Sequence, residues 1–192
     1  MDCYWLLTST FYGNWLPGDV RGFVSRVRDF RDDDPKGAAA RGADATPLAR
    51  HEHDVPRTPY DEDMPGLYRH AQEQLKGEPI QITREQAEAL LAQFQETATY
   101  LGWQIRAVAI MYNHFHLVIA VAGDPLPTKV LGDLKSYGSR VLNRRWGKPR
   151  NGTWWTYDGS KRKLVGEPAL RSAIEYVRNQ PEALVKWIAS KS

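Results

Sequence analysis

Two histidines separated by one residue, His114-Phe115-His116, are the part of the sequence best suited to chemistry. Side chains two apart on a β-strand point to the same face, so both imidazoles would lie side by side while Phe115 points to the opposite, core face. Two imidazoles on one face of a rigid strand supply half of a metal-binding site. The spacing leaves one alternative open, a pair of surface histidines at a hairpin.

The segment His51-Glu52-His53 has the same spacing in a different setting. Arg50 and Asp54 flank it, and no apolar strand pattern surrounds it. Nothing there would hold the two rings in fixed positions. We therefore expect a loop feature at these residues and not a metal site.

A third ligand is available in the segment AIEYVRNQ, residues 173–180. Residues four apart share a helix face, so Tyr176 and Gln180 are expected to point the same way, beside an apolar stripe and not on it. The side-chain oxygen of Gln180 is a suitable ligand for a hard cation. Two imidazoles and an amide oxygen favour Mg²⁺ or Mn²⁺ over a structural zinc.

The charge of the chain is unevenly distributed. Residues 126–192 contain 14 Lys and Arg against 5 Asp and Glu, although the whole chain carries a net charge of only +3. Such a basic segment predicts a surface for phosphate groups, with a solvated helix face as the alternative. The candidate phosphate contacts are Lys135, Arg140, Arg144, Arg145, Lys161, Arg162 and Lys163.

Aromatic residues lie among these basic residues. Trp154, Trp155 and Tyr157 could stack on unpaired bases, a combination that suits single-stranded or hairpin DNA. For the tryptophans the alternative is burial in the core.

The hydrophobic periodicity predicts strands and helices that would position these residues. Strands are expected at 4–16, 22–24, 103–111 and 116–121, with further short strands in 153–157 and after the basic turn of 159–165. Helices are expected at 64–75, 127–146 and 167–181, and a capping box at Thr83 and Gln86 begins another that ends at Gly102. This order favours an α+β fold with helices packed on an antiparallel sheet.

The chain is expected to form one domain over residues 1–192, interrupted by a polar excursion at about 29–77. That stretch is charged, rich in small residues and poor in side chains that could pack. A single cysteine, Cys3, excludes an internal disulfide. No run approaches the roughly 18 apolar residues of a membrane span, so we expect no membrane association and a cytoplasmic location.

The segments YNHFHLVI and AIEYVRNQ, separated by a basic helix, resemble the HUH superfamily. More narrowly, they resemble the insertion-sequence-200-like and REP-associated single-tyrosine transposases. The resemblance covers roughly the last 110 residues and the first strand. It implies the ferredoxin-like, RRM-like HUH nuclease fold, with Tyr176 as the nucleophile and His114, His116 and Gln180 as the ligands of Mg²⁺ or Mn²⁺. The excursion at 29–77 is longer than that family pattern needs, and it is either an added recognition element or an inert insertion.

The resemblance also implies a reaction and its partners. A tyrosine oxygen would attack a phosphodiester of single-stranded or hairpin DNA, leaving a 5′-phosphotyrosine link and a free 3′-hydroxyl. A homodimer is implied, in which the tyrosine helix can be exchanged between subunits.

Three alternatives stay open at this point. Tyr137, among the basic residues of 127–146, is a rival nucleophile, but Val141 and not a metal ligand follows it by one turn. The protein could be a domesticated hairpin-DNA-binding module that no longer transposes. It could also be an unrelated metal-dependent phosphoesterase that acts on a small substrate.

Overall fold

The computed structural model describes residues 2–20, 29–30, 50–51 and 65–190. The strand expected at 22–24, most of the excursion and His53 lie outside these residues. The described chain divides into two units, residues 1–14 with 76–192, and residues 15–75. The second unit contains the short strands β2 (Asp29–Phe30) and β3 (Arg50–His51), which pair antiparallel, and the helix α1 (Pro65–Glu73).

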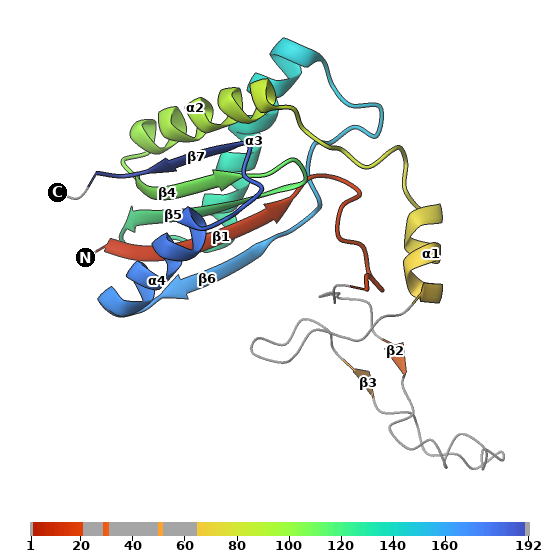
Figure 1. Ribbon diagram of the computed structural model, residues 1–192, viewed down its shortest axis with the longest axis horizontal. Helices are drawn as coiled ribbons and strands as arrows, with labels where there is room; N and C mark the ends of the chain where they lie inside the picture. The colour runs from red at the N-terminus through yellow and green to blue at the C-terminus, as the bar shows by residue number, and fades with distance from the viewer. Residues whose placement is uncertain (1, 21–28, 31–49, 52–64, 191–192) are drawn as a thin grey trace. The chain divides into compact units, whose positions relative to one another are not determined.

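A five-stranded antiparallel sheet organises the first unit (Figure 1). Its spatial order is β6-β1-β5-β4-β7, and all neighbouring strands run antiparallel. The strands are β1 (Asp2–Thr10), β4 (Gln104–Ile110), β5 (His114–Ala122), β6 (Ser160–Leu164) and β7 (Val185–Ile188). Along the chain, β1, α2, β4, β5, α3 and β6 follow the βαββαβ order of a ferredoxin-like unit. The predicted α+β class is confirmed.

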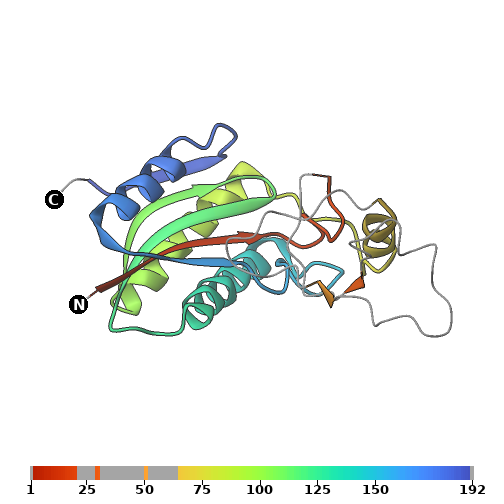
Figure 2. The ribbon, with the colours of Figure 1, turned by 90° about the horizontal axis from the view of Figure 1, so that it is seen from below.

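Helices cover both faces of this sheet because its central strands are apolar on both sides. Alternate residues of β5, such as Phe115 and Leu117, join the core formed with α2 (Arg84–Tyr100) and α3 (Pro127–Trp146). Val118 joins a smaller core on the other face, formed with α4 (Gly166–Arg178). Figure 2 shows α3 and α4 on opposite sides of the sheet. Successive residues of β5 therefore alternate between the face covered by α2 and α3 and the face covered by α4.

Capping residues determine both ends of α2. The Thr83 side chain accepts from the Gln86 backbone N–H, and the Gln86 side chain accepts from the Thr83 N–H, so the predicted capping box is confirmed. The positive φ of Gly102, +69°, follows the end of α2. No helix in the described part of the chain is long and apolar enough to span a membrane.

Several elements differ from the sequence-based expectation. The short strands β2 and β3 were not expected, and His51, expected in a loop, lies in β3. The strand β5 begins at His114 and not at His116, so both histidines belong to it. Residues 153–157 form no strand, and Trp155 makes only an isolated bridge with Phe11. The edge strand β7 was not expected, because its four residues are too few to show an alternating pattern.

The close packing of α2 on α3 depends on Gly138. A Cβ at this position would lie 2.7 Å from Cδ1 of Leu90 and 3.2 Å from Cζ2 of Trp155. We expect Gly138→Ala to lower the free energy of unfolding by about 1–3 kcal/mol, because both neighbours are buried and have little room to move. Urea unfolding measures the change.

Gly132 in the same helix provides the matched control, since a Cβ added there would have no neighbouring atom within 4 Å. Gly132→Ala should raise the free energy of unfolding by about 0.5–1 kcal/mol, because alanine is the better helix former. Equal stabilisation by both alanines would contradict the close approach of α2 and α3.

Candidate active site

The two histidines of β5 lie on the face of the sheet that α4 covers. The ring centroids of His114 and His116 are 4.8 Å apart, and Phe115 between them is fully buried against Phe94 and Trp155 on the other face. This is the arrangement that strand alternation predicts. The apolar contacts of Phe115 anchor β5 in the core, and β5 in turn positions the two imidazole rings.

The α4 helix brings Tyr176 to these rings. Leu170, Ala173 and Val177 anchor one side of α4 in the smaller core, and Tyr176 lies outside that stripe. Its hydroxyl oxygen is 3.1 Å from Nε2 of His116, and the two ring centroids are 4.9 Å apart. Tyr176 is 48% exposed whereas His116 is only 6% exposed. A buried imidazole is thus paired with a phenol that a large substrate can reach.

Nδ1 of each imidazole lies within hydrogen-bond distance of a neighbouring side chain. Nδ1 of His116 lies 2.7 Å from the hydroxyl oxygen of Thr8 on β1. Nδ1 of His114 lies 2.6 Å from the side-chain oxygen of Asn113. These hydrogen bonds hold the orientations of both rings.

Burial keeps the His116 imidazole neutral. The pKa of His116 falls from 6.5 to about 3, chiefly because burial disfavours the charged ring and secondly because His114 lies beside it. At neutral pH one ring nitrogen of His116 therefore has a lone pair to offer. A cation or a hydroxyl group can use that lone pair.

Gln180 is placed differently from the expectation. The α4 helix ends at Arg178 with Asn179 as its C-cap, so Gln180 follows the helix and does not sit on its face. Its side-chain N–H donates to the Tyr176 carbonyl at 3.0 Å. That bond engages the amide nitrogen and not the amide oxygen, and the described contacts join Gln180 to neither His114 nor His116.

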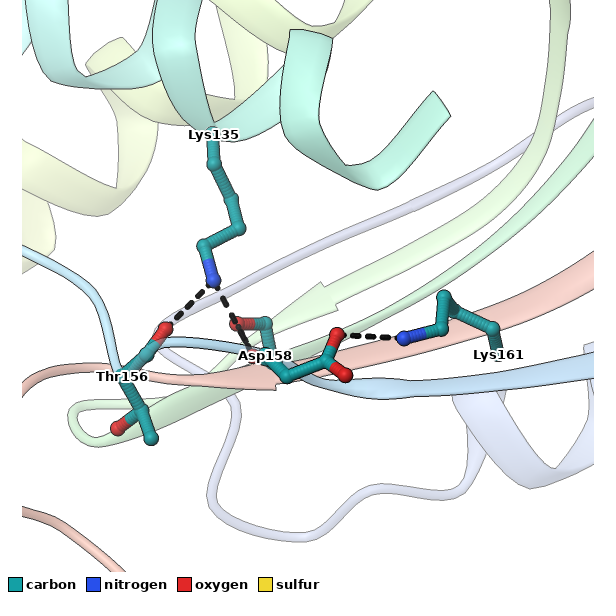
Figure 3. Close-up of polar contacts among 5 residues, drawn as sticks. Lys135, Thr156, Asp158 and Lys161 are labelled. Atoms are coloured by element: carbon teal, nitrogen blue, oxygen red, sulfur yellow. Dashed lines mark hydrogen bonds and ion pairs between the residues drawn. The ribbon is translucent and has the colours of Figure 1, made fainter. Parts of the chain in front are cut away.

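Lys135, one of the predicted phosphate contacts, has a structural position instead. Its ammonium group donates to the backbone carbonyls of Thr156, at 2.6 Å, and Asp158, at 3.1 Å, while the Asp158 carboxylate pairs with Lys161 (Figure 3). Lys135 is only 9% exposed. It belongs to the buried face of α3 because Leu131 and Leu142 lie four residues before and seven after it. That spacing is visible in the sequence, and the prediction overlooked it.

The remaining basic residues are at the surface to different degrees. Arg144 and Arg145 are exposed near the end of α3, and Arg162 is exposed on the edge strand β6. Arg145 also lies over the Trp146 ring. Arg140 and Lys163 are exposed too: Arg140 lies over the Tyr137 ring, and Lys163 pairs with Asp124. Lys161 is half-buried and pairs with Asp158.

The aromatic residues of 153–157 divide between the core and the surface. Trp154 and Trp155 are buried, and the Trp155 indole N–H donates to the Lys135 carbonyl at 2.9 Å. The alternative of core packing is therefore correct for both tryptophans. Tyr157 is 90% exposed and stays a candidate for base stacking.

Thr8 and Asn113 are the residues at this site that sequence reasoning missed. Asn113 precedes His114 directly, and it could have been considered as a partner of that ring. Thr8 carries no local signal, because its pairing with His116 joins strands 108 residues apart.

Comparison with known proteins identifies the family. The family model described as "Transposase IS200 like" matches residues 75–180, more than half of the chain. The chain belongs to this family. The matched segment contains both histidines, Tyr176 and Gln180.

Two solved structures are similar to this chain. One is a REP-associated tyrosine transposase bound to a REP hairpin, with a TM-score of 0.49 and 9% identity over 93% of this chain; the match spans 66% of that protein's length. The other is a protein from Deinococcus radiodurans R1 that is described as a transposase. Its TM-score is 0.42, with 15% identity over 95% of this chain and 94% of that one. No curated protein sequence gives a significant match.

The structural position of Lys135 can be tested by stability. Lys135→Met leaves the Thr156 and Asp158 carbonyls without the lysine donor, so we expect the free energy of unfolding to fall by about 1–3 kcal/mol. Arg144→Met, at an exposed position of the same helix, should change it by less than about 0.5 kcal/mol. Similar values for the two variants would show that Lys135 has no such role.

The same lysine predicts a pH dependence. Burial lowers the pKa of Lys135 from 10.5 to about 8, although the Asp158 carboxylate opposes this shift. Between these pH values the unfolded chain binds more protons than the folded chain, so folding becomes more favourable as the pH rises. The unfolding free energy of the wild type, relative to Lys135→Met, should increase from pH 7 to pH 10. A decrease over that range would contradict the lowered pKa.

Proposed function

We propose that this transposase cuts single-stranded or hairpin DNA with Tyr176 and retains the 5′ end as a phosphotyrosine. A Mg²⁺ or Mn²⁺ ion held by His114, His116 and Gln180 would assist. The observation that carries the proposal is the 3.1 Å contact between the Tyr176 hydroxyl and Nε2 of His116, inside the segment that matches the family. The proposal places the reaction in the cytoplasm and the active protein in a homodimer.

Tyr176 suits a nucleophile that must reach a polymer. Its ring is half exposed, while its hydroxyl touches a buried imidazole. Tyr137, the rival, lies on α3, which packs on the opposite face of the sheet from the imidazoles, and its ring contacts Arg140. Of the two tyrosines, Tyr176 is the one that combines access to solvent with contact to the histidines.

The step is a phosphoryl transfer. The Tyr176 oxygen forms a bond to phosphorus as the bond from phosphorus to the 3′ oxygen breaks. The phenolic proton leaves for solvent, and the departing 3′ oxygen takes up a proton to become a hydroxyl group. The phosphodiester count is preserved, so a 3′-hydroxyl can later attack the phosphotyrosine and rejoin the DNA.

The donor atoms at the site fit a hard divalent cation. Nδ1 of each ring bonds to Thr8 or Asn113, so Nε2 would be the ligating atom of each, and Gln180 has an amide oxygen that it could contribute. The described residues contain no group of three or more His, Cys, Asp or Glu side chains suited to a metal. The third protein ligand would therefore be an amide. A bound cation would polarise the scissile phosphate and stabilise the charge that develops on its oxygens.

Binding of the DNA backbone is assigned to the exposed cations. Four exposed arginines are candidates that pair with no carboxylate in the described part of the chain: Arg140, Arg144, Arg145 and Arg162. Lys161 and Lys163 would have to exchange a carboxylate for a phosphate. Tyr157 adds an exposed ring for an unpaired base.

The test is formation of a covalent adduct on labelled single-stranded or hairpin oligonucleotides with Mn²⁺. Wild type and Tyr137→Phe should both form an adduct that survives denaturing electrophoresis, and mass spectrometry should locate the nucleotide on Tyr176. Tyr176→Phe should form none, because it lacks the attacking oxygen. Chelation of the metal should reduce the adduct sharply in the wild type.

Each of the other outcomes would indicate a different function for the protein. A gel shift without any adduct would indicate a binding module. An adduct on Tyr137, or turnover of a small phosphoester that persists in Tyr176→Phe, would contradict the proposed role of Tyr176.

A further inference from the structure

The hydrogen bond of the His114 ring indicates that Nδ1 carries a proton. Nδ1 of His114 lies 2.6 Å from the side-chain oxygen of Asn113, and an amide oxygen can only accept. Nδ1 therefore donates, which fits the Nδ1–H tautomer. In that tautomer the lone pair is on Nε2.

The two contacts of the His116 ring are compatible with the same tautomer. The Tyr176 O–H can donate to Nε2, at 3.1 Å, while Nδ1–H donates to the Thr8 hydroxyl oxygen, at 2.7 Å. Because both hydroxyl groups can donate or accept, the reverse assignment fits the same distances, and the choice between the two is part of the proposal. The Thr8 contact is the shorter of the two and lies on the side of the ring away from Tyr176. Thr8 is directly opposite His116 in the pairing of β1 with β5.

We propose that Thr8 and Asn113 are positioning residues that hold His116 and His114 as Nδ1–H tautomers, so that both rings present Nε2 to the same cation. The role rests on the proposed function, which supplies the cation. It gives the two residues a task beyond packing: they select the ligating atom before any cation binds. Neither residue touches the reacting phosphate in this assignment.

Thr10 offers a matched control for Thr8. It lies two residues further along β1, on the same face of the strand, and directly opposite His114. Its hydroxyl group donates to the Thr156 hydroxyl at 2.8 Å and not to an imidazole. Thr10→Val thus removes a hydroxyl from the same strand and face without removing a bond to a ring.

The first experiment is NMR of the metal-free protein labelled with ¹⁵N-histidine, which separates N–H nitrogens from lone-pair nitrogens. Wild type should show Nδ1–H for both His114 and His116, assigned with His114→Gln and His116→Gln variants. Thr8→Val should shift His116 toward a mixture or toward Nε2–H, and Thr8→Ser should restore the wild-type spectrum. Asn113→Ala should act on His114 alone.

The second experiment is titration of the same proteins with Mn²⁺, followed by calorimetry. Thr8→Val should weaken binding by about 10–100-fold, the loss typical of an outer partner of a metal ligand, and Thr8→Ser should recover most of it. Thr10→Val should bind as the wild type does. Thermal unfolding of each variant separates this effect from a loss of fold.

The results test the positioning role separately from the proposed function. Wild-type Nε2–H at His116, or Thr8→Val with an unchanged tautomer and unchanged Mn²⁺ affinity, would overturn the positioning role. Nδ1–H rings and tight Mn²⁺ binding in a protein that forms no DNA adduct would support the positioning role and contradict the proposed transposase chemistry.

Discussion

The lone pair on Nε2 of His116 is the atomic feature on which the candidate site depends. In the structure the Tyr176 hydroxyl lies 3.1 Å from this nitrogen. The proposed cation would need the same lone pair, so a phenol hydrogen bond and metal ligation exclude one another at this atom. The phenol would therefore release His116 when a cation binds, and its oxygen would remain beside the place where a cation-bound phosphate lies. In the proposed reaction, the nucleophile and the cation would thus share one nitrogen.

The sheet makes this arrangement rigid. Phe115 is fully buried on one side of β5, and His116 is directed to the other, so the core formed with α2 and α3 anchors the strand that carries the imidazoles. The pairing of β1 with β5 brings Thr8 to Nδ1 of His116. On the opposite face, α4 is held by its own small core, which sets the position of Tyr176. Three elements distant in sequence converge, and each is fixed by apolar contacts that take no part in the chemistry.

The sequence predicts those features of the site that are local. Alternation along a strand places His114 and His116 on one face, and the apolar stripe of α4 leaves Tyr176 to one side of it. The helical limits of α3 and the cap of α2 likewise follow from local signals. Long-range pairing has no such signal, which is why Thr8 was missed. The end of α4 at Arg178 was missed because no glycine marks it and the following proline, Pro181, comes three residues later. Lys135 is a different case, since its place on the buried stripe of α3 could have been found from the spacing of Leu131 and Leu142.

The central claim is that the Tyr176 oxygen and the two imidazoles act on one phosphate. Anomalous diffraction from Mn²⁺ in crystals of Tyr176→Phe with an uncleaved oligonucleotide tests it most directly. The account predicts a single manganese peak in contact with Nε2 of His114, Nε2 of His116 and an oxygen of a phosphate that lies beside the ring at position 176. A manganese peak bound through Nδ1, or a phosphate at the metal but out of reach of that ring, would contradict it.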